Sequence, residues 1–336
     1  MIHLALMLTL AWFAPPPTEP PPPRDVRAII RDARLLIARH GDAVWPGLSR
    51  APQRILLVEA ARETLFCAAP TPGFIAIGDD AVSGCAMQVR PRRYDVDSEA
   101  TLDEDGVPLV VIGLPRATGR TGTDWLLTLL HEQFHQYQQV LPGFAAARDR
   151  ADARLRGTAS DAAWMLDHPF PYADPAVAAG IARLNDLAGE FLSATTPDAA
   201  RAAATAYVAA RGEVTGRLDA RDRCYLEFQL GQEGVARWTE LQFARVAGAQ
   251  SSKLRRAARD RRLWLSVSLK SARAQGLGIW KRGAFYALGA AEAEMLDRFA
   301  PDWRQAYVVE PFALGPLLAR TFDDAPTRGI SPQSAC

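Results

Sequence analysis

Two histidines and a glutamate stand in one short run, His131-Glu132-Gln133-Phe134-His135. Histidines four residues apart lie on the same side of an α-helix, so both imidazoles can bind one metal ion. The glutamate between them can accept a proton from water on that metal, and zinc lowers the pKa of such a water to about 7. The run predicts one Zn²⁺ per chain, with His131 and His135 as ligands and Glu132 as the general base of a hydrolase.

The sequence around this run predicts the helix that the chemistry needs. Thr121 with Asp124 resembles a capping box, and an acidic residue suits the positive end of a helix dipole. Pro142-Gly143 marks the end, so we expect a helix over about residues 124–140. The alternative interpretation is two histidines on the surface of an ordinary helix that bind nothing.

A metal with two histidine ligands needs a third protein ligand, which leaves the fourth position for water or substrate. A later helix, expected over about residues 219–247, contains Glu233-Gly234-Val235-Ala236. HExxH on one helix and Glu-Gly-x-Ala on a later one resemble the gluzincin (thermolysin-like) zinc metallopeptidases. The resemblance implies that Glu233 is the third zinc ligand. It covers these two helices and the strand before the first, which is a minority of the chain.

The chain departs from the gluzincin pattern at one position. Many gluzincins have an acid four residues after the ligand glutamate, where it hydrogen-bonds the first histidine, but here that residue is Arg237. Glu240 lies seven residues after Glu233, on the same helical face, and is the candidate for that orienting role. Two alternatives stay open: Glu227 as the third ligand, and Glu233 as an ordinary exposed carboxylate.

A hydrolase of this kind also needs a donor for the oxyanion and a surface that aligns the substrate. Tyr286 is the first candidate donor and Tyr137 the second, although packing is the commoner role for a half-buried tyrosine. Residues 107–114 are apolar and β-branched, and Pro108 favours an edge strand or the beginning of a strand. As an edge strand, this segment resembles the one that aligns extended peptides in zincins.

Apolar periodicity predicts an α+β fold of zincin-like type, with a small antiparallel or mixed sheet in the N-terminal half and a mainly helical C-terminal half. Apolar and β-branched runs predict strands at residues 55–58, 74–77, 82–89 and 107–114. Helical spacing predicts helices at residues 24–39, 124–140, 219–247 and 282–299.

The amino terminus predicts export to the periplasm or the outside of the cell. Residues 4–13 form an apolar stretch of signal-peptide length, too short to span a bilayer, and a proline-rich run follows at residues 15–23. We expect a signal peptide or anchor at 1–14, a linker at 15–23 and a zincin-like metallohydrolase domain at 24–336. The alternative is a frayed cytoplasmic N-terminus.

Four cysteines, an even number, suit an oxidising compartment and allow three pairings. Cys67 and Cys85 flank a segment rich in turn residues, so a bridge between them is our first expectation. The remaining two are Cys224 and Cys336. In a cytoplasmic protein, all four would instead be buried thiols.

Composition narrows the class of partner. A net charge of +1 over 336 residues gives no electrostatic case for nucleic acid, and we expect no membrane domain beyond an N-terminal anchor. The expected partner is a peptide or protein substrate, and the oligomeric state is left open. Two alternatives remain: a hydrolase of a non-peptide amide, and a metal-binding cell-envelope protein without turnover.

Overall fold

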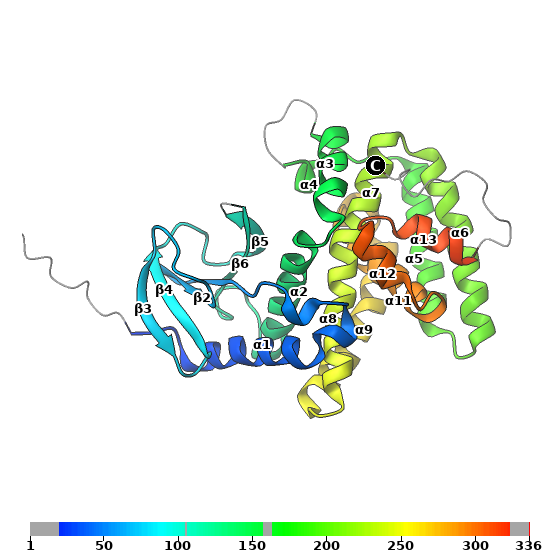
Figure 1. The fold of residues 1–336 in the computed structure, drawn as a ribbon. Coiled ribbons are helices and arrows are strands. Elements are labelled where there is room, and N and C mark those ends of the chain that lie inside the picture. Colours follow the sequence, from blue (N-terminus) through cyan, green and yellow to red (C-terminus); the bar gives the residue numbers. More distant parts are fainter. Residues whose placement is uncertain (1–19, 105, 157–162, 323–335) are drawn as a thin grey trace, which may run out of the picture.

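A sheet lies at one end of the molecule and a helical body at the other, with helix α2 between them and α1 extending from the sheet to the helices (Figure 1). The computed structural model describes residues 20–104, 106–156, 163–322 and 336. The predicted α+β class, with the sheet in the N-terminal half and helices dominating the C-terminal half, is confirmed. The expected leader at 1–14 and most of the proline-rich run lie outside the described residues.

Six strands form one mixed sheet in the order β3-β4-β2-β1-β6-β5. β1 runs parallel to β6, and the other neighbours are antiparallel. Val110 and Ile112 of β6 face the main core beneath the helices, whereas Leu109 and Val111 face a second apolar cluster. Burial on both faces explains why β6 is continuously apolar. The strands are β1 (Ile55–Val58), β2 (Arg62–Phe66), β3 (Ile75–Asp80), β4 (Cys85–Pro91), β5 (Glu99–Glu104) and β6 (Val107–Gly113).

The expectation that residues 107–114 form an edge strand is wrong, because β6 lies between β1 and β5. The edge strands are β3 and β5, and β5, which lies next to β6, is a segment that sequence periodicity did not predict. Pro108 is tolerated inside the sheet because β6 begins to pair with β1 only at Val110. The Pro108 carbonyl accepts a hydrogen bond from Gln136 Nε2 at that end of the sheet. Pro108 therefore marks the beginning of a strand, the other alternative that its position favoured.

Thirteen α-helices occur in the described residues. The predicted helices at 24–39, 124–140, 219–247 and 282–299 all form, with the third interrupted by a π-helical turn at Leu230–Gly234 between α7 and α8. The helices are α1 (Arg24–Val44), α2 (Gly122–Gln139), α3 (Phe144–Leu155), α4 (Trp164–Asp167), α5 (Pro175–Ser193), α6 (Pro197–Arg217), α7 (Ala220–Gln229), α8 (Val235–Gly248), α9 (Ser252–Gln275), α10 (Leu277–Trp280), α11 (Gly283–Phe299), α12 (Trp303–Val309) and α13 (Leu314–Phe322).

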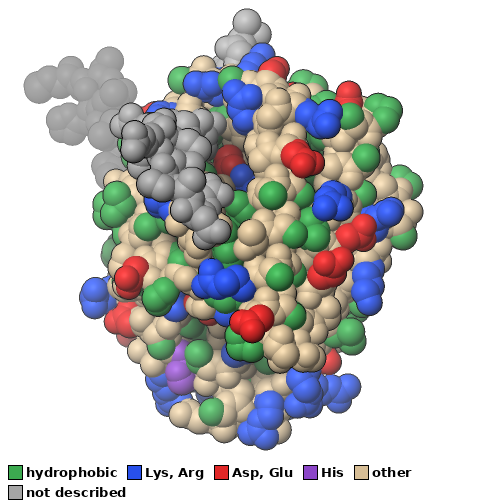
Figure 2. Space-filling view, turned by 90° about the vertical axis from the view of Figure 1, so that its right-hand side faces the viewer, with side chains coloured by type: hydrophobic (Ala, Val, Ile, Leu, Met, Phe, Trp, Pro, Cys, Tyr) green, Lys and Arg blue, Asp and Glu red, His purple; other side chains and the backbone are tan. Residues whose placement is uncertain are grey.

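Two disulfides link distant segments. Cys67 bridges Cys85, as the turn-rich segment between them predicted, and joins the end of β2 to the start of β4. Cys224 bridges Cys336 and attaches the end of the chain to α7. Among the described residues, no helix is long and apolar enough to cross a membrane. Basic, acidic and hydrophobic side chains are intermixed on the face drawn in Figure 2, as expected for a net charge of +1.

Candidate metal centre

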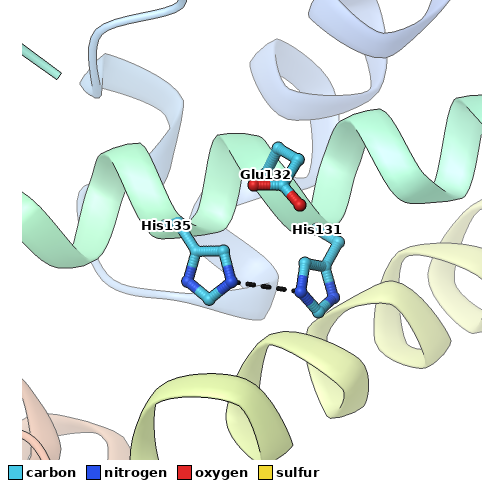
Figure 3. Close-up of side chains that lie close together, drawn as sticks. All are labelled: His131, Glu132 and His135. Atoms are coloured by element: carbon cyan, nitrogen blue, oxygen red, sulfur yellow. Dashed lines mark hydrogen bonds between the residues drawn. The ribbon is translucent and has the colours of Figure 1, made fainter. Parts of the chain in front are cut away.

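Helix α2 is buried on every side, which fixes the direction of each of its side chains. Thr121 caps the helix by accepting a hydrogen bond from the Asp124 amide, as the sequence predicts. Every residue from 125 to 138 is buried, between the sheet on one side and α1 and α8 on others. Figure 3 shows the His131 and His135 imidazoles on the same side of α2. A buried helix of this kind has little freedom to rotate, so its functional groups are held by packing.

Three donor atoms converge beside α2. His131 Nε2 and His135 Nε2 are 3.1 Å apart, and Glu233 Oε2 lies 3.6 Å from the first and 3.5 Å from the second. In a tetrahedral site with metal–ligand bonds of about 2.0–2.1 Å, neighbouring ligand atoms are about 3.3 Å apart. The three atoms therefore have the spacing and chemistry to hold one small metal ion. Glu233 comes from the π-helical turn that precedes α8.

The outer nitrogens of both imidazoles are held by neighbouring side chains. His131 Nδ1 lies 2.8 Å from Glu240 Oε1, an acceptor that favours the proton on Nδ1 and leaves the Nε2 lone pair for a metal. His135 Nδ1 lies 2.6 Å from Gln138 Oε1 and 3.0 Å from Gln232 Nε2, so it faces one acceptor and one donor. Gln138 is itself fixed, because its Nε2 donates to the Tyr307 hydroxyl and to backbone carbonyls of the π-helical turn.

Glu240 is buried and tied to two arginines as well as to His131. Its carboxylate lies 3.0 Å from Arg237 Nη1 and 3.1 Å from Arg261 Nε. Burial raises the pKa of Glu240, but Arg237, His131 and Arg261 together lower it to about 2. Glu240 therefore stays ionised at neutral pH. Arg237, which occupies the position where gluzincins have the orienting acid, here supports the acid one turn later.

The charge of the cluster depends on His131. Burial by itself lowers the pKa of His131, but the nearby carboxylates of Glu233 and Glu240 outweigh burial and raise the pKa to about 9. The neighbouring imidazoles of His131 and His135 hold the pKa of Glu233 well below its ordinary value, against its burial. At neutral pH the metal-free cluster thus holds a proton on His131. A metal ion that binds here must displace that proton.

Glu132 points to a different neighbour. Its Oε2 accepts a 2.9 Å hydrogen bond from Thr101 Oγ1, and the same hydroxyl lies 2.7 Å from the Glu132 carbonyl. Thr101 belongs to β5, so the edge strand is fixed directly against the helix that carries the histidines. The Glu132 carboxylate also lies within 4.8 Å of the histidine ligand atoms. It is therefore placed between the cluster and the edge of the sheet.

Tyr286 is brought to the cluster by the close crossing of two helices. A Cβ atom on Gly234 would lie 2.4 Å from the Gly289 Cα, so glycine at both positions allows α11 to touch the π-helical turn. Tyr286, one turn before Gly289, then faces Glu233, and burial followed by the Glu233 charge raises the pKa of its hydroxyl. Arg282 Nη1 donates a 2.9 Å hydrogen bond to that hydroxyl.

Two other sequence candidates lie outside the cluster. The Tyr137 hydroxyl donates to the Pro46 carbonyl, and the ring packs against Trp45 and Phe134, so Tyr137 has a packing role. Glu227 Oε1 accepts a 2.6 Å hydrogen bond from Arg211 Nη1, and Oε2 accepts from the Gly315 amide. Of the two candidate third ligands, the structure brings Glu233, and not Glu227, to the histidines.

Sequence reasoning missed Thr101 and Gln138. Gln138 lies three residues after His135 on the same helix, so helical spacing alone was enough to suggest their contact. Thr101 gives no such signal, because its strand has the charged sequence Glu-Ala-Thr-Leu-Asp-Glu and reaches Glu132 only through sheet pairing. Arg282 is a third addition, found only through the position of α11.

Comparisons with known proteins give no information about the function of this site. No protein-family model, no curated protein sequence and no solved structure matched this chain. The structure shows a buried His-Glu-x-x-His group in a helix that could bind a metal ion. The likeness to gluzincins therefore rests on the residues and distances given above.

Proposed function

We propose that the protein is a zinc-dependent hydrolase, and most specifically a metallopeptidase. The observation that carries the proposal is the convergence of His131 Nε2, His135 Nε2 and Glu233 Oε2 at 3.1–3.6 Å beside Glu132. Three ligands and an adjoining carboxylate are typical of catalytic zinc, whereas structural zinc usually has four protein ligands.

The roles of the residues follow from their positions. Zinc in this cluster would polarise the scissile carbonyl and make a bound water acidic. Glu132 takes the proton of the attacking water and passes it to the leaving amine. The Tyr286 hydroxyl and the Arg282 guanidinium supply donors for the oxyanion. Strand β5 offers its free edge to pair with an extended peptide. This is the role that we expected from the sequence for residues 107–114.

Metal analysis and turnover test the proposal in sequence. Purified protein is expected to contain one zinc per chain, and His131→Ala is expected to lose it; unchanged metal content in that variant would contradict the site. Glu132→Gln is expected to keep zinc and to hydrolyse a mixed peptide library at least about 10³-fold more slowly, since it removes the base. Glu213→Gln, an exposed residue on α6, is the matched control and is expected to behave as wild type.

The same experiment separates the alternatives. Zinc that is lost in His131→Ala, with no cleavage of peptides but with cleavage of a non-peptide amide that depends on Glu132, would assign a different amide substrate. Zinc binding without hydrolysis of either class would leave a metal-binding protein without turnover.

We also propose that the protein is exported, on the basis of its two disulfides and its apolar leader sequence. Disulfides persist in oxidising compartments and are rare in the cytosol. Mass spectrometry of protein from the periplasm or medium is expected to show both bridges and an N-terminus after Ala14. An intact Met1 on reduced cytosolic protein would contradict export.

A further inference from the structure

A cavity of about 540 Å³ lies beside the metal centre, which is within the usual size range of a ligand pocket. It is lined by the loop before α2, the first turn of α2, and α8, α9, α10 and α11. Tyr286, which faces Glu233, forms part of its wall, as do Arg237 and Arg261, which hold Glu240. The cavity therefore shares residues with the supports of the histidine ligands.

The wall of the cavity combines apolar surface with N–H donors. Trp264, Trp280, Leu241 and Leu265 supply apolar and aromatic surface. Three further lining residues are arginines: Arg120, Arg237 and Arg261. Asp124 is the acid among the lining residues. Such a wall suits an apolar stem that ends in a group with acceptor oxygens.

Arg261 is the donor best placed to recognise such a group. Its side chain is 13% exposed, yet Nη2 has no hydrogen-bond partner among the described residues. Nε lies 3.1 Å from Glu240 but is not aligned for a hydrogen bond, and Nη1 lies 3.5 Å from Asp124. Buried donors are almost always satisfied, so an unpaired donor on a residue that lines the cavity points to an acceptor that the described residues do not supply. Trp238, a fully buried lining residue, also has an unpaired indole N–H.

We propose that this cavity is a substrate subsite for a carboxylate carried on an apolar stem, with Arg261 as the residue that recognises the carboxylate. As a substrate subsite it rests on the proposed hydrolase function. The carboxylate has two possible sources in a peptide, the C-terminus of the chain and an acidic side chain. Trp264 and Trp280 form the walls that contact the stem.

Binding of small probes tests the cavity without requiring turnover. The probes are 3-phenylpropionate and its uncharged amide, 3-phenylpropanamide, followed by tryptophan fluorescence in full-length protein. Metal-free protein is used, so that the carboxylate cannot bind zinc instead, and zinc-loaded Glu132→Gln protein provides the second state. The carboxylate is expected to bind about 10- to 100-fold tighter than the amide in both states, the range for hydrogen bonds to charged groups. Equal affinities would overturn the proposal.

Three variants locate the binding. Arg261→Gln is expected to lose most of the preference for the carboxylate while the amide binds as before. Trp264→Ala removes apolar surface of the cavity but no charge, so it is expected to lower the affinity for both probes by a similar factor. Arg273→Gln, on the same helix but paired with Asp186 at the surface, is the matched control and is expected to change neither. If the preference for the carboxylate survives in Arg261→Gln, the probes bind at another site. The same conclusion follows if the affinities of both probes are unchanged in Trp264→Ala.

Peptide pairs then identify the source of the carboxylate. A peptide with a free C-terminus is compared with its C-terminal amide, and a glutamate peptide with its glutamine analogue. The pair that matches the subsite is expected to differ at least about 10-fold in kcat/KM, and neither pair differing would reject the subsite role. If no peptide is cleaved but the probes still discriminate through Arg261, the proposed peptidase function fails while the carboxylate cavity stands.

Discussion

Two buried ionic clusters, which share one helical segment, have opposite properties. The histidine cluster contains His131, Glu132, His135, Glu233 and Glu240. The arginine cluster contains Tyr207, Arg211, Glu227 and Glu292, in the interior of the helical body. Glu227 and Glu233 are six residues apart on α7 and the π-helical turn, so one helical segment contributes a carboxylate to each cluster.

The arginine cluster satisfies itself. Arg211 donates to Glu227 and to Glu292, and the Tyr207 hydroxyl donates to Glu292. Burial lowers the pKa of Arg211, but the two carboxylates outweigh it and raise that pKa well above its ordinary value. In the histidine cluster, by contrast, two imidazole nitrogens and a carboxylate oxygen converge on one another. The difference teaches that the acceptor or donor character of the neighbours, rather than burial or residue type, decides whether a buried glutamate is structural or available to a metal.

Matched substitutions of the two glutamates give the largest expected contrast. Glu233→Gln removes the carboxylate that we propose as the third ligand, and it is expected to lower zinc affinity at least about 100-fold and to abolish hydrolysis. Glu227→Gln is expected to keep zinc and to lose about 1–3 kcal/mol of unfolding free energy. Chelator competition and urea unfolding measure the two quantities. The reverse pattern would show that the ligands are wrongly assigned.

Removing the cation of the arginine cluster is expected to cost stability alone. Arg211→Met leaves two carboxylates buried without a partner, and breaking a buried ion pair in this way costs about 3–5 kcal/mol. Urea unfolding measures the loss, and the folded fraction is expected to keep one zinc per chain. Arg217→Met, exposed at the end of the same helix, is the control and is expected to change stability by less than about 0.5 kcal/mol.

The histidine cluster should give metal-free stability a pH dependence between about pH 6.5 and 9, whereas the arginine cluster should not. Because the pKa of His131 is raised from 6.5 to about 9 in the folded protein, the protonated imidazole stabilises the metal-free fold. That contribution is complete below pH 6.5 and is lost as the pH rises through about 9, at up to about 1.4 kcal/mol per pH unit. Thermal unfolding of metal-free protein checks the slope. A slope that persists unchanged in His131→Asn would assign it to another group.

The orienting carboxylate has the smallest expected effect. Glu240→Gln keeps the size of the side chain but weakens its hold on His131 Nδ1, and loss of such a contact lowers metal affinity about 10- to 100-fold. Zinc titration against a chromophoric chelator measures the change. Wild-type affinity in Glu240→Gln would mean that Arg237 and Arg261, rather than His131, are the functional partners of this carboxylate.

The sequence by itself determined what each helix carries and on which face. Capping at Thr121, the four-residue spacing of the histidines and the stop at Pro142 are local signals, so α2 and the face that carries both histidines were predictable. The α+β class and the bridge between Cys67 and Cys85 were predictable for the same reason. Periodicity also placed Glu233 and Glu240 on one face of the later helix.

Only the tertiary structure decided which faces meet. The choice of Glu233 over Glu227 depends on how α7 and α8 pack against α2, about a hundred residues earlier in the chain. The edge strand beside β6, which is β5, was not predicted because it carries charged residues without an apolar pattern, and Pro108 favoured β6 instead. Long-range packing sets these contacts through close approaches such as that of Gly234 and Gly289, and a pattern along one segment does not record the shape of its partner.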